Sequence, residues 1–210
     1  MTPQRIFWYF ADPMCSWCWG FAPVVSAVKD AYANEFQIAL MLGGLRPGTT
    51  RPMSAQDREA ILHHWRQVHE RTGQPFAFDA AMPEGFVYDT EPASRAVIAV
   101  AEIDAERTFP YFKTVQAAFY AEGRDVTRPE TLAELAGRHG VAAAEFRARF
   151  DSDEVRHKLG IHFQQTRQVG VRGFPTVVLQ NEAESTLLAN GYRSFDELRP
   201  EIDAWLTGAT

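Results

Sequence analysis

The sequence predicts an α/β protein in which a βαβ half and a ββα half are separated by a long, all-helical segment. Two observations lead to this fold class. Short apolar segments typical of buried strands lie near the two ends of the chain, at residues 5–10, 36–42, 176–180 and 185–189. Between these pairs, apolar residues recur at helical spacing. We therefore expect one discontinuous domain formed by residues 1–45 and 170–210, and an inserted helical domain over residues 46–169.

The first half begins with a strand at residues 5–10, which is short, apolar and aromatic. A helix is expected to follow and to end at Ala33, and Pro23 in its early part predicts a bend. The segment 36–42 alternates and then becomes continuously apolar, as a second strand would. Strand, helix and strand form a βαβ unit, whose crossover should be right-handed.

The helical segment begins after the glycines and Pro47 of residues 43–48, which end the strand pattern. Ser54 and Asp57 predict a capping box for a first helix that ends at Gly73. Residues 74–89 show no period and are expected to form a loop. Further helices are predicted over residues 91–104, 109–121, 129–139, 142–150 and 152–168. The helix-spaced aromatic residues are interpreted as core rather than as a cofactor site.

A hairpin and a helix are expected to close the chain. The strand at 176–180 turns near Asn181 into its partner at 185–189. Ser194 and Glu197 predict a second capping box for the last helix. Pro200 is expected to fray or kink the first turns of that helix.

Composition and charge exclude several classes of function. A chain of 210 residues with 46% apolar and 23% charged residues is typical of a globular protein. The net charge of -6 argues against a nucleic-acid or anionic-membrane partner, since both need a basic face. The apolar run from Ile6 to Ala11 is too short for a signal-peptide core or a membrane span. A cytoplasmic location is therefore expected.

Both cysteines of the chain, Cys15 and Cys18, lie between the first strand and the first helix. The first turn of a helix carries unpaired N–H groups and about half a positive charge, and both stabilise a thiolate. Cys15, outermost in that turn, is therefore predicted to be the nucleophile, and Cys18 the shielded resolving thiol. No cysteine remains for a structural disulfide, which fits a reducing compartment. The six histidines show no ligand-like pairing, so no metal site is predicted.

The order of these elements resembles the thioredoxin fold with a large helical insertion that DsbA-like thiol-disulfide oxidoreductases have. Asp12 to Gly20 reads Asp-Pro-x-Cys-x-Trp-Cys-x-Gly, which is similar to the signature of the cytoplasmic FrnE-like branch, described as candidate protein-disulfide isomerases. Gly173-Phe174-Pro175-Thr176 is the second shared motif. The resemblance implies a cis peptide bond before Pro175, with Pro175 facing Cys15. It also implies that the backbone of Phe174 offers hydrogen bonds to an extended polypeptide.

Two features depart from the pattern of the fold. Many thioredoxin-like enzymes carry a buried acid on the first strand that takes the proton of the resolving cysteine, and Tyr9 occupies that place. The proton of Cys18 is then expected to pass to water or to Asp12, although Asp12 is also a natural turn or cap residue. The dipeptide Ser16-Trp17 lacks the histidine of strongly oxidising periplasmic enzymes, so an intermediate redox poise is expected.

The sequence thus predicts a protein-disulfide oxidoreductase or isomerase that needs no cofactor beyond its own redox-active disulfide. Cys15 attacks a disulfide of a protein or peptide substrate, Cys18 releases the product, and an external thiol system such as glutathione or thioredoxin resets the pair. An apolar substrate rim is expected from Trp17, Trp19, Phe21 and Phe174.

Two alternatives stay open at this point. A glutathione-dependent isomerase or transferase of the same fold activates glutathione with a single serine or cysteine, so the presence of Cys18 argues against it. In the other alternative the protein is not an enzyme, and Cys15 and Cys18 are ligands of a soft metal or of an iron–sulfur cluster.

Overall fold

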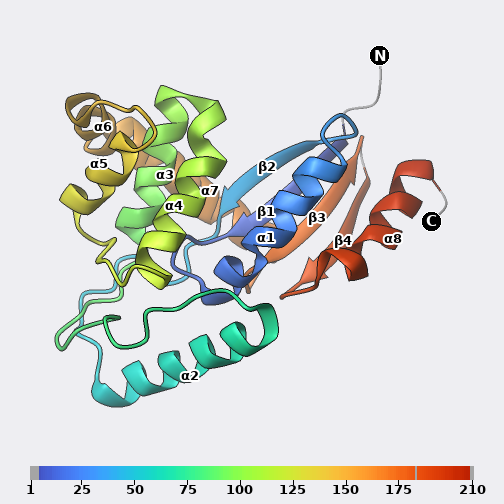
Figure 1. The fold of residues 1–210 in the computed structure, drawn as a ribbon. Helices are drawn as coiled ribbons and strands as arrows, with labels where there is room; N and C mark the ends of the chain where they lie inside the picture. Colours follow the sequence, from blue (N-terminus) through green and yellow to red (C-terminus); the bar gives the residue numbers. More distant parts are fainter. Residues whose placement is uncertain (1–4, 183, 209–210) are drawn as a thin grey trace.

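The computed structural model describes residues 5–182 and 184–208, which contain a four-stranded sheet with the strand order β2-β1-β3-β4 (Figure 1). The strands are β1 (Arg5–Ala11), β2 (Gln37–Leu42), β3 (Thr176–Asn181) and β4 (Glu184–Asn190). Strand β1 pairs in parallel with β2 and antiparallel with β3, and β3 pairs antiparallel with β4. The βαβ unit and the hairpin expected from the sequence are therefore confirmed.

One face of the sheet is covered by α1 (Ser16–Ala31) and α8 (Phe195–Thr207), as Figure 1 shows. Alternate side chains of a strand point to the same face. Phe7, Tyr9 and Ala11 of β1 are at most 1% exposed and form the floor on which α1 packs. Residues 12–15, called the active-site turn below because they end at Cys15, connect the end of β1 to the start of α1, so this layer fixes the position of the turn.

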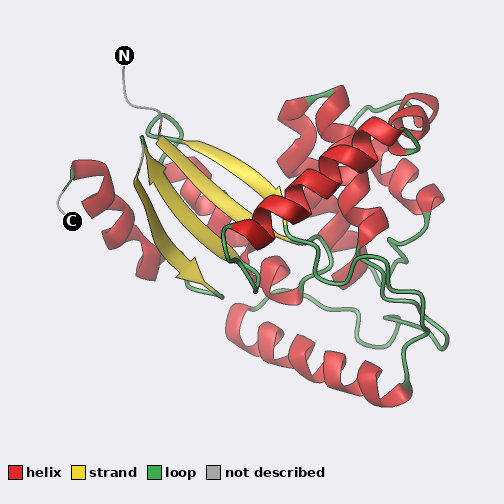
Figure 2. Ribbon diagram, turned by 180° about the vertical axis from the view of Figure 1, so that it is seen from behind, coloured by secondary structure: helices red, strands yellow, loops and turns green. Residues whose placement is uncertain are grey.

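The segment between β2 and β3 is helical. Its elements are α2 (Ala55–Thr72), α3 (Glu91–Ile103), a 3-10 helix (Ala105–Arg107), α4 (Thr108–Tyr120), α5 (Pro129–Gly137), α6 (Ala143–Phe150) and α7 (Asp153–Gln168). Helices α3 to α7 gather beside the β2 edge of the sheet, and α7 contacts β2 and lies in the foreground when the molecule is seen from behind (Figure 2). Helix α2 lies apart from this group and packs on α1. The helices agree with the sequence predictions, but the 3-10 helix was not predicted.

Both predicted capping boxes are formed, at Ser54 with Asp57 and at Ser194 with Glu197. Gly73 ends α2 in the left-handed conformation, with a φ of 71°. The fraying predicted from Pro200 is not found, because α8 is unbroken from Phe195 to Thr207, whereas a kink at Pro200 stays a prediction. The capping box holds the first turn of α8, where Pro200 was expected to cause fraying.

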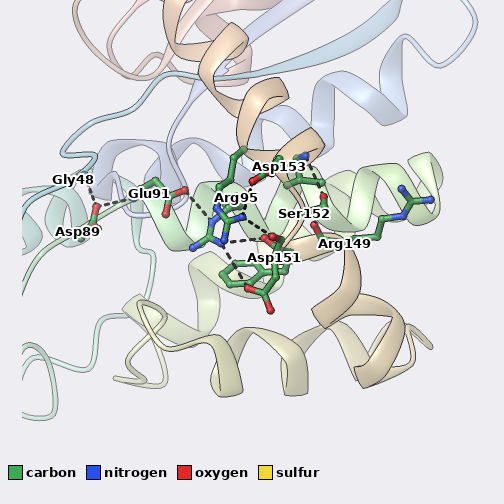
Figure 3. Close-up of polar contacts among 11 residues, drawn as sticks. Gly48, Asp89, Glu91, Arg95, Arg149, Asp151, Ser152 and Asp153 are labelled. Atoms are coloured by element: carbon green, nitrogen blue, oxygen red, sulfur yellow. Dashed lines mark hydrogen bonds and ion pairs between the residues drawn. The ribbon is translucent and has the colours of Figure 1, made fainter.

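Arg95 of α3 connects the start of α3 to the end of α6 (Figure 3). Its Nε lies 2.9 Å from Oε1 of Glu91, and its Nη1 donates a hydrogen bond of 3.0 Å to the carbonyl of Phe150. The guanidinium also lies 3.9 Å from the centroid of the Phe150 ring. The Arg95 side chain is 13% exposed, so this charge is held inside the helical segment by specific partners.

A single hydrophobic core extends from the layer between the sheet and α1 into the helical segment. It includes Phe7 of β1, Trp65 of α2, Val97 of α3 and Phe146 of α6. The division into one discontinuous domain and one inserted domain stays a proposal, because the two parts share this hydrophobic core. Within residues 5–182 and 184–208, none of the helices combines the length and apolar character needed to cross a bilayer.

Candidate active site

Cys15 and Cys18 lie at the start of α1, where the sequence placed them. Cys15 is the N-cap residue, and Cys18 is one turn further into the helix. Cys15 is 5% exposed and Cys18 is fully buried, and both are free thiols. The predicted order of accessibility is therefore found, although Cys15 is less exposed than expected. Cys15 makes no side-chain hydrogen bond to the N–H groups of the first turn of α1, so these groups have no side-chain cap from the N-cap residue.

Asp12 holds the active-site turn through both of its carboxylate oxygens. Oδ1 accepts a hydrogen bond of 2.9 Å from the N–H of Met14, and Oδ2 accepts one of 2.7 Å from the N–H of Leu45. The side chain is fully buried, and this burial raises the pKa of Asp12 to about 6 against the opposing effect of the two backbone donors. Asp12 is thus a turn residue whose ionisation occurs close to neutral pH. A proton-relay role for it stays a proposal.

Tyr88 supports the same turn from the loop that precedes α3. Its hydroxyl donates a hydrogen bond of 2.6 Å to the carbonyl of Met14, and both groups are buried. The sequence prediction assigned no function to residues 74–89, and no local pattern in that loop indicates such a contact. The contact depends on how the helical segment packs against the turn.

Trp19 does not contribute to a substrate rim, which corrects the sequence prediction. It is 5% exposed, its ring stacks on Tyr120 at a centroid distance of 6.3 Å, and its Nε1 donates a hydrogen bond of 3.0 Å to the carbonyl of Pro75. Phe21 is fully buried as well. Both residues face inward because the helix they lie on packs against the sheet and against α2.

Gln74 satisfies a carbonyl that the helix itself leaves unpaired. Pro23 lies inside α1 and has no N–H, so it cannot pair with the carbonyl of Trp19 four residues earlier. The side-chain Nε2 of Gln74 donates a hydrogen bond of 2.8 Å to that carbonyl. The sequence prediction missed Gln74, although Pro23 indicated that a donor from elsewhere was needed.

The loop before β3 faces Cys15. The peptide bond between Phe174 and Pro175 is cis, and the Cys15 thiol donates a hydrogen bond of 3.5 Å to the carbonyl of Phe174. Pro175 is buried, and Phe174 is partly buried. The Phe174 ring lies against Gly43, where an added Cβ would come within 1.9 Å of Cζ. The structure thus brings together the two motifs that are 159 residues apart in the chain.

Trp17 is the partly buried aromatic residue of the motif itself. The centroid of its ring lies 6.0 Å from that of Tyr192. The guanidinium of Arg71 lies over the Tyr192 ring, 5.6 Å from the centroid of that ring. Tyr192 is also partly buried, and the sequence prediction missed it. Trp17, Phe174 and Tyr192 are therefore the aromatic residues that remain available at the surface near Cys15.

Tyr9 lies beneath the pair, on the floor of the layer. Burial raises the pKa of the Cys18 thiol well above its usual range, and neighbouring Cys15 raises it further. Burial also raises the pKa of Tyr9, as do the nearby Cys18 and Cys15. Both groups are therefore neutral near neutral pH. In the part of the chain that the structure describes, no three histidine, cysteine, aspartate or glutamate side chains gather as a metal site would require.

Comparison with known proteins supports this arrangement. The sequence model of the DSBA-like thioredoxin domain matches residues 8–203. The chain belongs to the DSBA-like thioredoxin domain family. The thioredoxin fold with a helical insertion is therefore confirmed.

Solved structures agree with membership of the DSBA-like family. The chain is 42% identical to a candidate protein disulfide isomerase from Nitrosomonas europaea, with a TM-score of 0.92 over 99% of this chain and 100% of that one. It is 26% identical to the cytosolic disulfide reductase DsbM from Pseudomonas aeruginosa, with a TM-score of 0.80 over 96% of this chain and 98% of the other.

Curated relatives are more distant. The chain is 25% identical over 178 residues to the ClpXP adapter protein SpxH from Halalkalibacterium halodurans, a match that covers 82% of this chain. The same match covers 58% of that relative, so the chain spans about three fifths of the length of this SpxH protein.

Proposed function

We propose that this DsbA-like protein exchanges disulfides with protein or peptide substrates, with Cys15 as the nucleophile and Cys18 as the resolving thiol. The observation that carries the proposal is the position of Cys15, which lies at the N-terminus of α1 and within 3.5 Å of the Phe174 carbonyl beside Pro175. Cys18 is buried behind it, so a substrate meets Cys15 first.

In the proposed reaction, the Cys15 thiolate attacks one sulfur of the substrate disulfide, and the other sulfur leaves as a thiolate. Cys18 then attacks the Cys15 sulfur, which breaks the mixed disulfide and forms the Cys15–Cys18 disulfide. The substrate gains two electrons, and the cysteine pair loses them. The N–H groups and the dipole of α1 stabilise the Cys15 thiolate in the first step.

The loop at Phe174 and Pro175 supplies a place for the substrate backbone. Pro175 has no N–H, and the Phe174 carbonyl already lies beside the reactive sulfur. An extended segment next to the mixed disulfide can therefore donate to this carbonyl. Trp17, Phe174 and Tyr192 would contact its apolar side chains. Leu45, whose N–H donates a hydrogen bond to Asp12, is 40% exposed and offers a further apolar contact.

Similarity to DsbM supports a reducing direction in the cytoplasm. DsbM is described as a cytosolic disulfide reductase, and its structure is also known with GSH. Glutathione is therefore the thiol that we propose resets the Cys15–Cys18 disulfide. In this direction the dithiol form reduces the substrate, and two equivalents of glutathione restore it.

Two single substitutions test the roles of the cysteines. Cys18→Ser should accumulate mixed disulfides with a protein substrate that contains disulfides, because no second thiol is present to release them. Cys15→Ser should form none and should lose turnover. Non-reducing electrophoresis and mass spectrometry measure both results. Turnover by Cys15→Ser, or an adduct on Cys18 in place of Cys15, would contradict the assignment.

A further inference from the structure

We propose that Arg46 and Arg71 bind the two carboxylates of the glutathione molecule that reacts at Cys15, one on each side of the reactive sulfur. The inference rests on the proposed function, because it names the residues that recognise the thiol partner of the same site. Neither arginine belongs to the two sequence motifs. Each one reaches the cysteine motif through an aromatic side chain.

Arg46 lies on the side of Met14, the residue before Cys15. Its backbone is fixed to Thr90, because its N–H donates a hydrogen bond of 3.1 Å to Oγ1 and its carbonyl accepts one of 3.4 Å from the N–H. Its guanidinium lies over the Tyr88 ring, 5.2 Å from the centroid. The hydroxyl of Tyr88 donates a hydrogen bond to the carbonyl of Met14. One tyrosine therefore connects Arg46 to the active-site turn.

Arg71 lies on the other side of the motif, in the last turn of α2. Its guanidinium lies over the Tyr192 ring, and the Tyr192 ring in turn lies beside that of Trp17. Trp17 follows Cys15 by two positions in the first turn of α1. Arg46 and Arg71 are therefore connected to the motif on opposite sides of Cys15 along the chain.

The donors of both guanidinium groups are free to bind a ligand. A guanidinium that stacks on an aromatic ring uses its face, so the N–H groups in its plane stay available. All hydrogen bonds that Arg46 makes to described residues come from its backbone. Arg71 has Glu197 at 3.8 Å, which is beyond hydrogen-bond distance. Both arginines are exposed, so a ligand in solvent can reach them.

The carboxylates beside the two arginines are already used as helix caps. Asp57 accepts hydrogen bonds from the N–H and the hydroxyl of Ser54 at the start of α2. Glu197 accepts the same pair of hydrogen bonds from Ser194 at the start of α8. Capping fixes these carboxylates on the backbone, so they do not take up the donors of Arg46 and Arg71.

Glutathione matches this arrangement of positive charge. It carries a carboxylate at each end, with its cysteine between them, and a tripeptide extends over about 10 Å. An arginine binds a carboxylate through two parallel hydrogen bonds. The chain has a net charge of -6, which opposes the approach of an anion, so two exposed arginines near Cys15 give a local attraction that the rest of the surface does not.

The test measures the attack of Cys15 on two disulfides in a Cys18→Ser background, where the adduct on Cys15 accumulates and is quantified by mass. One disulfide is oxidised glutathione, and the other is oxidised mercaptoethanol, which has no charge. Arg46→Gln, Arg71→Gln and the double variant are compared. The matched control is Arg147→Gln, which removes an exposed arginine on α6, away from the start of α1 (Figure 1).

The quantity compared is the rate constant for oxidised glutathione divided by that for oxidised mercaptoethanol. This ratio cancels any change in the Cys15 thiolate, because both disulfides react with the same sulfur. Each substitution of Arg46 or Arg71 by glutamine should lower the ratio about three- to tenfold, as expected for the loss of an exposed, charge-assisted contact. The double variant should lower it further, and Arg147→Gln should leave it unchanged.

Two further measurements separate recognition from general charge. Arg71→Lys should keep only part of the ratio, because lysine retains the charge but not the planar pair of donors. Added salt should lower the ratio of the protein with both arginines towards that of the double variant, because salt screens exposed charges.

A ratio that the double variant leaves unchanged would overturn the proposal. An equal fall in Arg147→Gln would also overturn it, because any loss of positive charge would then have the same effect. Failure of the proposed function has a different signature, since Cys15 would then form no adduct with either disulfide, whichever residues occupy positions 46 and 71.

Discussion

At the scale of single residues, the site combines one thiol that is 5% exposed, Cys15, with three more deeply buried groups that can gain or lose protons. Cys15 faces the substrate side, whereas Asp12, Cys18 and Tyr9 lie beneath it and are at most 1% exposed. Burial disfavours the charged form of each of these three groups, so their pKa values are raised. At pH 7, Cys18 and Tyr9 are therefore neutral, whereas Asp12, with a pKa of about 6, is largely ionised.

Asp12 gives a stability prediction with a definite sign. Its pKa of about 6 in the folded protein lies above the ordinary value of 3.8, so the folded state binds this proton more tightly than the unfolded state does. The free energy of unfolding should therefore fall, by about 1–3 kcal/mol from this group, as the pH rises from about 4 to about 6. Asp12→Asn should remove this pH-dependent contribution. The free energy of unfolding of the variant should therefore lie furthest below that of the wild-type protein at low pH, and the gap should shrink as the pH rises.

Urea unfolding of the wild-type protein and Asp12→Asn at several pH values measures this component. Asparagine offers a single acceptor to the N–H groups of Met14 and Leu45, so the variant carries an additional loss of stability that does not depend on pH. The informative quantity is how the difference in the free energy of unfolding between the two proteins changes with pH. Parallel stability curves for the two proteins would show that Asp12 does not titrate in this range.

At the scale of secondary-structure elements, two loops meet over the end of β1. The loop after β2 places Gly43 beneath the Phe174 ring, and its N–H donates a hydrogen bond of 2.8 Å to the carbonyl of Ala11. The loop before β3 places the Phe174 carbonyl beside Cys15. A side chain at position 43 would therefore move the element that approaches the reactive sulfur.

Gly43→Ala should lower the free energy of unfolding by about 1–3 kcal/mol, because the Phe174 ring must leave its position. It should also slow disulfide exchange, because Phe174 belongs to the loop that faces Cys15, and a displaced ring would shift that loop. Gly160→Ala in α7 is the control, since an added Cβ there meets no atom within 4 Å. Alanine is favoured over glycine inside a helix, so this control should be neutral or slightly stabilising.

Denaturant unfolding and the rate of reaction with oxidised glutathione test both expectations. A Gly43→Ala protein as stable and as fast as the Gly160→Ala control would show that the loop adjusts without consequence. A loss of stability without a change in rate would separate the packing of Phe174 from its part in exchange.

The elements themselves were largely predictable from sequence because their signals are local. The capping boxes at Ser54 and Ser194, the end of α2 at Gly73 and the position of the cysteine pair all depend on residues within one helical turn. The contacts that hold the site were not predictable in the same way. Tyr88 and Gln74 act across more than 50 residues, and their roles depend on how the helical segment packs.

For Trp19, the sequence predicted a role at the site that the packing of the chain does not support. Its place beside Cys18 suggested a substrate contact, and the chemistry of an exposed aromatic residue would have suited that role. Only the packing of α1 against the residues that follow α2 shows that the ring is buried and bonded to Pro75. A motif predicts which residues are near a reactive atom, whereas burial decides which of them a substrate can reach.

At the scale of the whole molecule, the helical segment is part of the site rather than an addition to it. Tyr88, Gln74 and Pro75 support the turn and the first helix, and one hydrophobic core passes from the sheet into the helices. The reactive pair, the loop at Phe174 and Pro175, and the residues that support them come from three separate stretches of the chain. For the proposed exchange, this assembled site must interconvert between a dithiol and a disulfide.

The equilibrium of Cys15 and Cys18 in graded glutathione buffers tests this requirement most directly. Thiol labelling and mass measure the fractions of dithiol and disulfide, and the fluorescence of Trp17 and Trp19 follows the same change. We expect the pair to close reversibly into an intramolecular disulfide, at a potential near the glutathione range. If both thiols stayed labelled in the most oxidising buffer, or only glutathione adducts formed, disulfide exchange through the Cys15–Cys18 pair would be contradicted.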